Sequence, residues 1–91
     1  MTQRVKLYVT GKVQGVYFRV YTKEEANRLG LTGTVKNLED GGVEIIAEGK
    51  KEKLDKLIEW TKTGSPNAKT ENVSIKFYGA INKWESFKII K

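Results

Sequence analysis

Two glycines and an arginine near the N-terminus form a pattern that could bind an anion. Gly11 and Gly15 bracket a short segment after a strand-like run, and Arg19 follows. Glycines let successive backbone N–H groups converge on an anion, and a helix starting after the loop adds its N-terminal N–H groups and dipole. The arginine adds a planar, charged fork suited to phosphate. The pattern is not a Walker A loop. An alternative that the spacing alone allows is a plain connecting loop with Arg19 in solvent.

Asn37 is a second candidate site residue. It falls in the apolar register of a strand in which Leu31, Gly33 and Val35 alternate with polar residues. A buried amide requires hydrogen-bond partners, so Asn37 could hold a water molecule or a ligand. The alternative is that Asn37 caps the turn that follows it, as asparagine often does.

The residue types that are missing limit the possible chemistry. The 91 residues include no histidine and no cysteine, which excludes Ser–His and Cys–His nucleophilic pairs, imidazole or thiolate zinc sites and disulfides. An enzyme made from the remaining types depends on positioning and on electrostatic stabilisation. The net charge of +6 fits a small anionic substrate, a nucleic acid or simply a basic surface.

Hydrophobic periodicity predicts the elements that position these residues. Strict alternation predicts strands over residues 5–9, 31–37, 43–47, 73–77 and 87–89. Helical spacing predicts helices over residues 19–29 and 54–61, which end at Gly30 and before Gly64. Thr22 and Glu25 form a T-x-x-E capping box, which predicts a competing start for the first helix at Thr22.

The element order is β-α-β-β-α-β followed by a short C-terminal strand. Two helices cannot cover both faces of such a sheet, so we expect an α+β, ferredoxin-like fold with both helices on one face of an antiparallel sheet. We expect one domain over residues 1–91. The chain has no apolar run of the roughly 18 residues that a membrane span needs and no signal peptide, so the sequence predicts a cytoplasmic protein.

Two longer motifs resemble the signatures of the acylphosphatase family. The first runs Val9-x-Gly11-x-Val13-Gln14-Gly15-Val16-x-Phe18-Arg19. The second runs Gly33-x-Val35-Lys36-Asn37, then Gly41-x-Val43 and Gly49. The resemblance covers nearly the whole chain and implies the same ferredoxin-like fold.

The resemblance also implies an activity, which is hydrolysis of the carboxyl–phosphate anhydride of small acyl phosphates without a metal or another cofactor. Arg19 matches the arginine that binds the phosphoryl group, and Asn37 matches the asparagine that orients the attacking water. The backbone cradle matches Gln14, Gly15, Val16, Tyr17 and Phe18. We further expect phosphate or sulfate to bind this loop, and a monomer with no nucleic-acid or membrane partner. The sequence departs from the family at Thr34, where an aromatic residue is usual. Tyr17 occupies a position at which the family motif specifies no residue type.

Three alternatives remain. An RRM-type RNA-binding module shares the element order, and residues 7–11 (LYVTG) resemble its first strand, but residues 42–49 (GVEIIAEG) carry two glutamates and no aromatic residue where an RRM presents aromatics. A non-catalytic anion-binding domain is a second alternative, which the presence of both Arg19 and Asn37 disfavours. A domain from a larger maturation enzyme is a third, although Met1 just before the first strand and Lys91 just after the last favour a free-standing protein.

Overall fold

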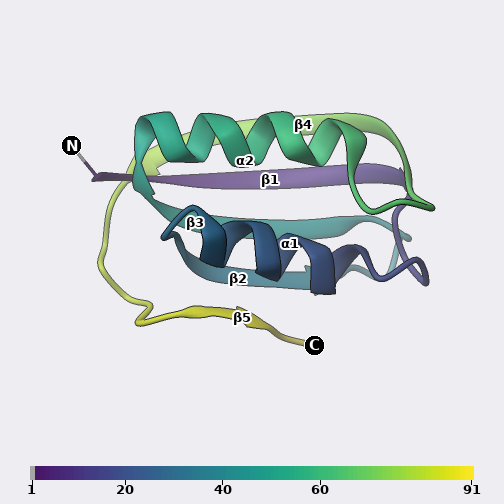
Figure 1. Cartoon of the computed structure of the whole chain (residues 1–91), viewed down its shortest axis with the longest axis horizontal. Coiled ribbons are helices and arrows are strands. Elements are labelled where there is room, and N and C mark those ends of the chain that lie inside the picture. Colours follow the sequence, from purple (N-terminus) through teal and green to yellow (C-terminus); the bar gives the residue numbers. More distant parts are fainter. Residues whose placement is uncertain (1) are drawn as a thin grey trace.

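Seven elements follow one another along residues 2–91, which the computed structural model describes (Figure 1). They are β1 (Thr2–Lys12), α1 (Phe18–Arg28), β2 (Thr32–Asn37), β3 (Val43–Lys50), α2 (Lys51–Thr63), β4 (Lys69–Gly79) and β5 (Phe87–Ile89). This order confirms the predicted β-α-β-β-α-β pattern with an added terminal strand.

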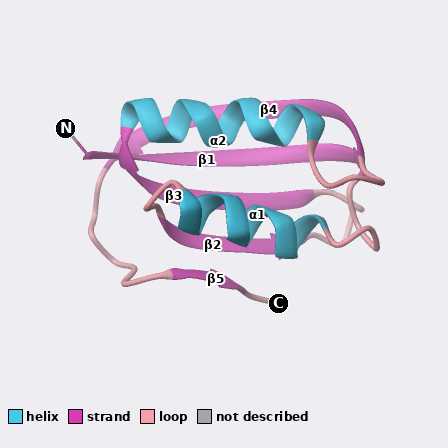
Figure 2. Ribbon diagram, in the orientation of Figure 1, coloured by secondary structure: helices cyan, strands magenta, loops and turns pink. Residues whose placement is uncertain are grey.

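The strands form one sheet in the order β4-β1-β3-β2-β5, and both helices cover the same face of it (Figure 2). The pairs β1–β4, β1–β3 and β2–β3 are antiparallel, which confirms the ferredoxin-like prediction. The short β5 joins the edge of β2 in the parallel direction, so the complete sheet is mixed. The sequence pattern contains no signal for that direction.

Alternation along β1 explains how the sheet acquires two different faces. Val5, Leu7 and Val9 point towards the helices and are fully buried, whereas Lys6 and Tyr8 point to the uncovered face. Burial of apolar area stabilises the fold by about 25 cal/mol per Å². The same core includes apolar residues of both helices and of the last strand: Phe18, Ala26, Leu54, Leu57, Ile58 and Phe87.

The first helix ends as its sequence predicts. Gly30 has φ +73°, a conformation that glycine adopts without steric cost. The N–H of Leu31 donates to the carbonyl of Ala26, and the N–H of Gly30 donates to that of Asn27. This is a Schellman motif, and it turns the chain directly into β2.

A buried carboxylate holds the segment that carries the chain from β4 to β5. Glu48 is only 4% exposed, and its two oxygens accept hydrogen bonds from the backbone N–H groups of Ile81 (2.6 Å) and Asn82 (3.0 Å). Hydrogen bonds to an ionised acceptor are stronger than neutral ones. Glu48 therefore fixes the path by which β5 reaches β2. Within residues 2–91, no helix has the length and apolar character needed to cross a membrane.

Candidate active site

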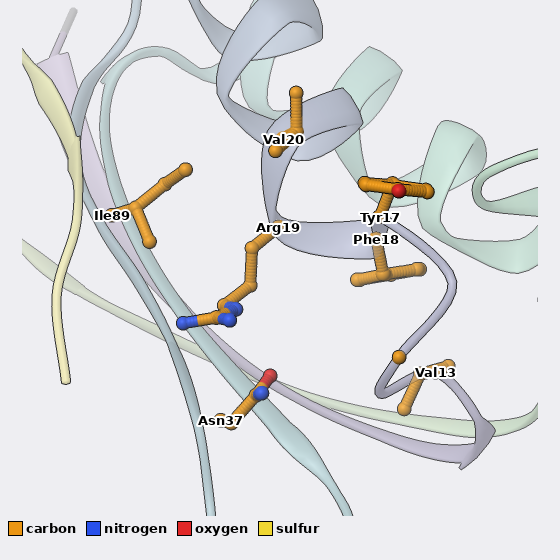
Figure 3. Close-up of a pocket in the computed structure, with 8 residues that line it drawn as sticks. Val13, Tyr17, Phe18, Arg19, Val20, Asn37 and Ile89 are labelled. Carbon is orange, nitrogen blue, oxygen red and sulfur yellow. The ribbon is translucent and has the colours of Figure 1, made fainter.

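A cavity of about 330 Å³ opens where the N-terminus of α1 faces the end of β2 (Figure 3). Of the predicted site residues, it is lined by Gly15, Tyr17, Phe18, Arg19 and Asn37. Three further residues line it that the sequence did not single out: Val13, Val20 and Ile89. The structure therefore brings the two predicted side chains, Arg19 and Asn37, into one cavity.

The predicted cradle residues Gln14 and Val16 lie outside the lining and hold the loop from behind. The side-chain amide of Gln14 donates to the carbonyls of Leu38 (2.7 Å) and Gly42 (2.9 Å) in the β2–β3 turn. The carbonyl of Val16 accepts a hydrogen bond from Ser65 Oγ (2.8 Å), after the end of α2. The loop is thus tied to two separate parts of the fold, which limits its movement around a ligand.

The helix begins at Phe18, so the capping box predicted at Thr22 is wrong. Thr22 lies one turn inside α1, where its hydroxyl donates to the carbonyl of Phe18 (2.7 Å). Glu25 pairs with Arg28 on the solvent side. Tyr17, the residue before the helix, makes no side-chain cap. The first N–H groups of α1 consequently remain available at the cavity.

The backbone around the cavity has the conformation of an anion-binding loop. Gly15 has φ +74°, and Tyr17 has φ +60° although it is not a glycine. Left-handed residues in a loop turn successive N–H groups to one side, which forms a concave site for anions. The first turn of α1 contains no acidic residue, so its dipole is not neutralised there. Backbone and helix together favour a negatively charged ligand.

The Phe18 ring anchors the start of the helix. It is 1% exposed and packs against Trp60 of α2, with a centroid separation of 5.5 Å. Gly64 leaves room for this ring, because a Cβ at that position would lie 2.8 Å from Phe18 Cε1. Trp60 is therefore a packing residue, and its contact with Phe18 fixes the start of the helix that carries Arg19.

Arg19 is half-buried and extends across the cavity towards Asn37 (Figure 3). Within residues 2–91, no carboxylate lies within salt-bridge distance of it, whereas Arg28 at the other end of the same helix is paired with Glu25. A guanidinium that is not neutralised in this way can bind phosphoryl oxygens with two donors at once.

Asn37 places an acceptor opposite this cation. Its Oδ1 is buried and accepts no hydrogen bond from residues 2–91, and Figure 3 shows this oxygen directed towards Arg19. Buried acceptors normally have a partner, so this atom is available for a ligand or a water molecule. The capping alternative is not needed, because Asp40 Oδ1 accepts from the N–H of Gly42 (2.8 Å) and closes the turn.

Asp40 also ties this turn to β1. Its second oxygen accepts a hydrogen bond from the Tyr8 hydroxyl. The bond lowers the pKa of Asp40, helped by the Gly42 N–H, and it raises the pKa of Tyr8. The turn after Asn37 is therefore fixed from two sides, by Tyr8 through Asp40 and by Gln14.

The lining residues that the sequence did not identify differ in how they could have been found. Val13 and Val20 lie next to predicted site residues in the chain. Ile89 reaches the cavity only because β5 pairs with β2, with Ile89 opposite Val35. Thr34, where the sequence departs from the family pattern, pairs with Ile46 and does not line the cavity.

The site offers hydrogen-bond donors to an anion and no metal-binding cluster. Among residues 2–91, no group of three or more His, Cys, Asp or Glu side chains is placed to bind a metal ion. The cavity lining contributes one guanidinium, one amide and the backbone of the loop. Such a set can bind an oxyanion and polarise it.

Comparison with known proteins gives a consistent assignment. The family model described as Acylphosphatase matches residues 5–89. An "Acylphosphatase" of Pelotomaculum thermopropionicum is 42% identical over 86 residues, 94% of either chain, and one of Rubrobacter xylanophilus is 49% identical over 74 residues, 81% of this chain and 67% of the other. The crystal structure of acylphosphatase from Bacillus subtilis has a TM-score of 0.94 at 38% identity and covers 100% of both chains. The chain is therefore a member of the acylphosphatase family.

Proposed function

We propose that this protein hydrolyses acyl phosphates to a carboxylate and inorganic phosphate, with no metal and no other cofactor. The observation that carries the proposal is the shared cavity of Arg19 and Asn37 Oδ1 at the open N-terminus of α1. A cation and a buried acceptor face each other there, beside backbone donors. This arrangement suits a phosphoryl group on one side and its attacking water on the other.

In the proposed reaction, the backbone N–H groups of the loop and the Arg19 guanidinium bind the phosphoryl oxygens. Phosphoryl transfer depends mainly on positioning and on stabilisation of charge on these oxygens. The water molecule donates a hydrogen bond to Asn37 Oδ1. This contact directs a lone pair of the water oxygen at phosphorus. The resulting attack is in line with the bond to the acyl oxygen.

The bond from the water oxygen to phosphorus forms as the bond from phosphorus to the acyl oxygen breaks. The electron pair of the broken bond leaves with the carboxylate, which is a stable anion and needs no strong general acid. The water proton passes to a phosphoryl oxygen, which yields inorganic phosphate. No carboxylate lines the cavity among residues 2–91, which supports the substrate itself as the proton acceptor.

The test is hydrolysis of benzoyl phosphate by the wild type and by Arg19→Ala, with and without a chelator. We expect turnover that the chelator leaves unchanged and the substitution reduces by at least about 10²-fold. Arg28→Ala is a matched control, since Arg28 lies on the same helix and pairs with Glu25. A folded wild type without turnover would contradict the proposal and favour a non-catalytic anion-binding domain.

The proposal includes the expected ligands and state of the protein. Inorganic phosphate, as product, and sulfate should compete with substrate for the loop. We expect a monomer in the cytoplasm without a nucleic-acid or membrane partner, which size-exclusion chromatography, fractionation and oligonucleotide titration can examine. Residues 42–49 present no aromatic side chain where an RRM stacks bases, which supports the expectation that RNA does not bind.

A further inference from the structure

Three exposed apolar side chains surround the entrance of the cavity, and phosphoryl chemistry does not explain them. Tyr17, Val20 and Ile89 are 73%, 43% and 37% exposed, respectively, and all three line the cavity. They come from the loop, from α1 and from β5. Apolar groups from three separate elements around one opening are typical of a ligand-binding pocket.

The position of Ile89 follows from the pairing of β5. Gly33 pairs with Phe87 and Val35 with Ile89, and the N–H of Ile90 donates to the carbonyl of Val35 (2.9 Å). Alternation then directs Phe87 and Ile89 to the helix-covered face, where Phe87 is buried and Ile89 reaches the cavity. The last strand thus supplies a wall to a site whose proposed chemistry lies on α1 and β2.

In-line attack indicates which part of the substrate meets this wall. The attacking water and the leaving oxygen lie on opposite sides of phosphorus. Asn37 marks the side of the water. Figure 3 shows Val20 on the opposite side of Arg19 from Asn37, with Ile89 flanking the guanidinium. An acyl group that leaves on the side away from Asn37 would meet Val20 and Ile89, which line the same cavity.

We propose that Val20 and Ile89, with Tyr17, form the acyl-binding side of this site and select an apolar acyl group, aromatic rings included. The inference rests on the proposed function and names the substrate class for it. The lining contains no lysine and no carboxylate among residues 2–91, and Arg19 is engaged by the phosphoryl group. A charged acyl group would lose its hydration here without gaining an oppositely charged side chain, which is unfavourable.

The experiment compares three substrates that share the reacting anhydride. Acetyl phosphate offers the apolar side chains one methyl group, benzoyl phosphate offers them a phenyl ring, and 4-carboxybenzoyl phosphate adds a carboxylate to that ring. For the wild type we expect kcat/KM to be highest for benzoyl phosphate and at least about 10-fold lower for the carboxylated analogue. Equal values for the two aromatic substrates would overturn the inference while leaving the proposed function in place.

Variants locate the effect. Ile89→Ala and Val20→Ala should each lower kcat/KM for benzoyl phosphate by up to about 10-fold and change that for acetyl phosphate less than about 2-fold. The inhibition constant of inorganic phosphate should not change. Val20→Ala keeps a good helix former in α1, so it remains informative if Ile89→Ala loosens β5. Equal losses on both substrates would overturn the inference.

The matched control is Ile90→Ala. Ile90 is 38% exposed, nearly the same as Ile89, but it does not line the cavity. It should leave the substrate preference unchanged, and an effect equal to that of Ile89→Ala would contradict the assignment. A wild type that hydrolyses none of the three substrates would instead overturn the proposed function itself.

Discussion

The side-chain amide of Gln14 lies 2.7 Å from the carbonyl oxygen of Leu38, the residue that directly follows Asn37. The same amide also reaches Gly42 at 2.9 Å. One side chain on the proposed phosphate-binding loop therefore contacts the turn that follows Asn37, the residue proposed to orient the attacking water. The two parts of the site, which are far apart in the sequence, are held in register by this contact.

Gln14→Leu should remove the contact between the loop that carries Gln14 and the turn after Asn37. Loss of two hydrogen bonds is expected to lower the free energy of unfolding by about 1–3 kcal/mol, measured by urea denaturation. Misplacement of Asn37 relative to the loop should lower kcat by about 10- to 100-fold. Gln3→Leu, at the opposite end of β1, should leave kcat unchanged. A Gln14→Leu enzyme with wild-type kcat would show that the loop and the turn align without this contact.

Arg19→Lys should be nearly as inactive as Arg19→Ala. Lysine keeps the charge but offers a single point of contact instead of a planar fork, so transition-state stabilisation should fall by about 2.7 kcal/mol or more, as for a lost oxyanion donor. Steady-state kinetics with benzoyl phosphate measure it. Recovery of most of the activity in Arg19→Lys would mean that charge alone, and not the fork, is required.

Asn37→Ala should lower kcat by about 10²-fold with little change in the inhibition constant of inorganic phosphate. Because Oδ1 accepts no hydrogen bond from residues 2–91, its removal should not lower the free energy of unfolding. Asn27→Ala on the exposed side of α1 is the control. Activity near that of the wild type in folded Asn37→Ala would remove Asn37 from the mechanism.

The Tyr8–Asp40 bond should make stability depend on pH at both ends of the range. The folded pKa of Asp40 is lowered from 3.8, so its contribution is present above that value and is lost as pH falls through the folded pKa. The folded pKa of Tyr8 is raised from 10.0, so its contribution is present below that value and is lost as pH rises through the folded pKa.

Tyr8→Phe tests this directly. The variant should unfold more easily than the wild type at pH 7, and the difference should become smaller at acidic pH, where Asp40 is protonated. Urea denaturation of both proteins across pH gives the comparison. A difference that stays constant through acidic pH would show that the Tyr8 hydroxyl acts without the carboxylate.

Most of the fold could be predicted because its signals are local. The alternation of Val5, Leu7 and Val9 determines which face of β1 is buried, and Gly30 ends α1 through its own backbone conformation. Asn37 was identifiable because a polar residue stood in an apolar register. Each of these inferences needs only a few neighbouring residues.

Features that depend on distant contacts were not predictable in the same way. Thr22 and Glu25 have the types and spacing of a cap, but α1 begins a turn earlier, where Phe18 packs on Trp60 and Tyr17 adopts a left-handed conformation. The segment from β4 to β5, which Glu48 holds in place, determines the parallel direction of β5. The same segment therefore determines the presence of Ile89 in the cavity.

The segment from β4 to β5 separates the cavity lining into two parts that come from different regions of the sequence. The loop, Arg19 and Asn37 belong to β1, α1 and β2, whereas the wall at Ile89 belongs to a three-residue strand attached at the sheet edge. With Ile89 on the proposed acyl-binding side, we expect substitutions in the last few residues to change the preferred acyl group while leaving Arg19 and Asn37 in place. Family members with the same loop, arginine and asparagine could then differ in substrate preference through their C-terminal residues alone.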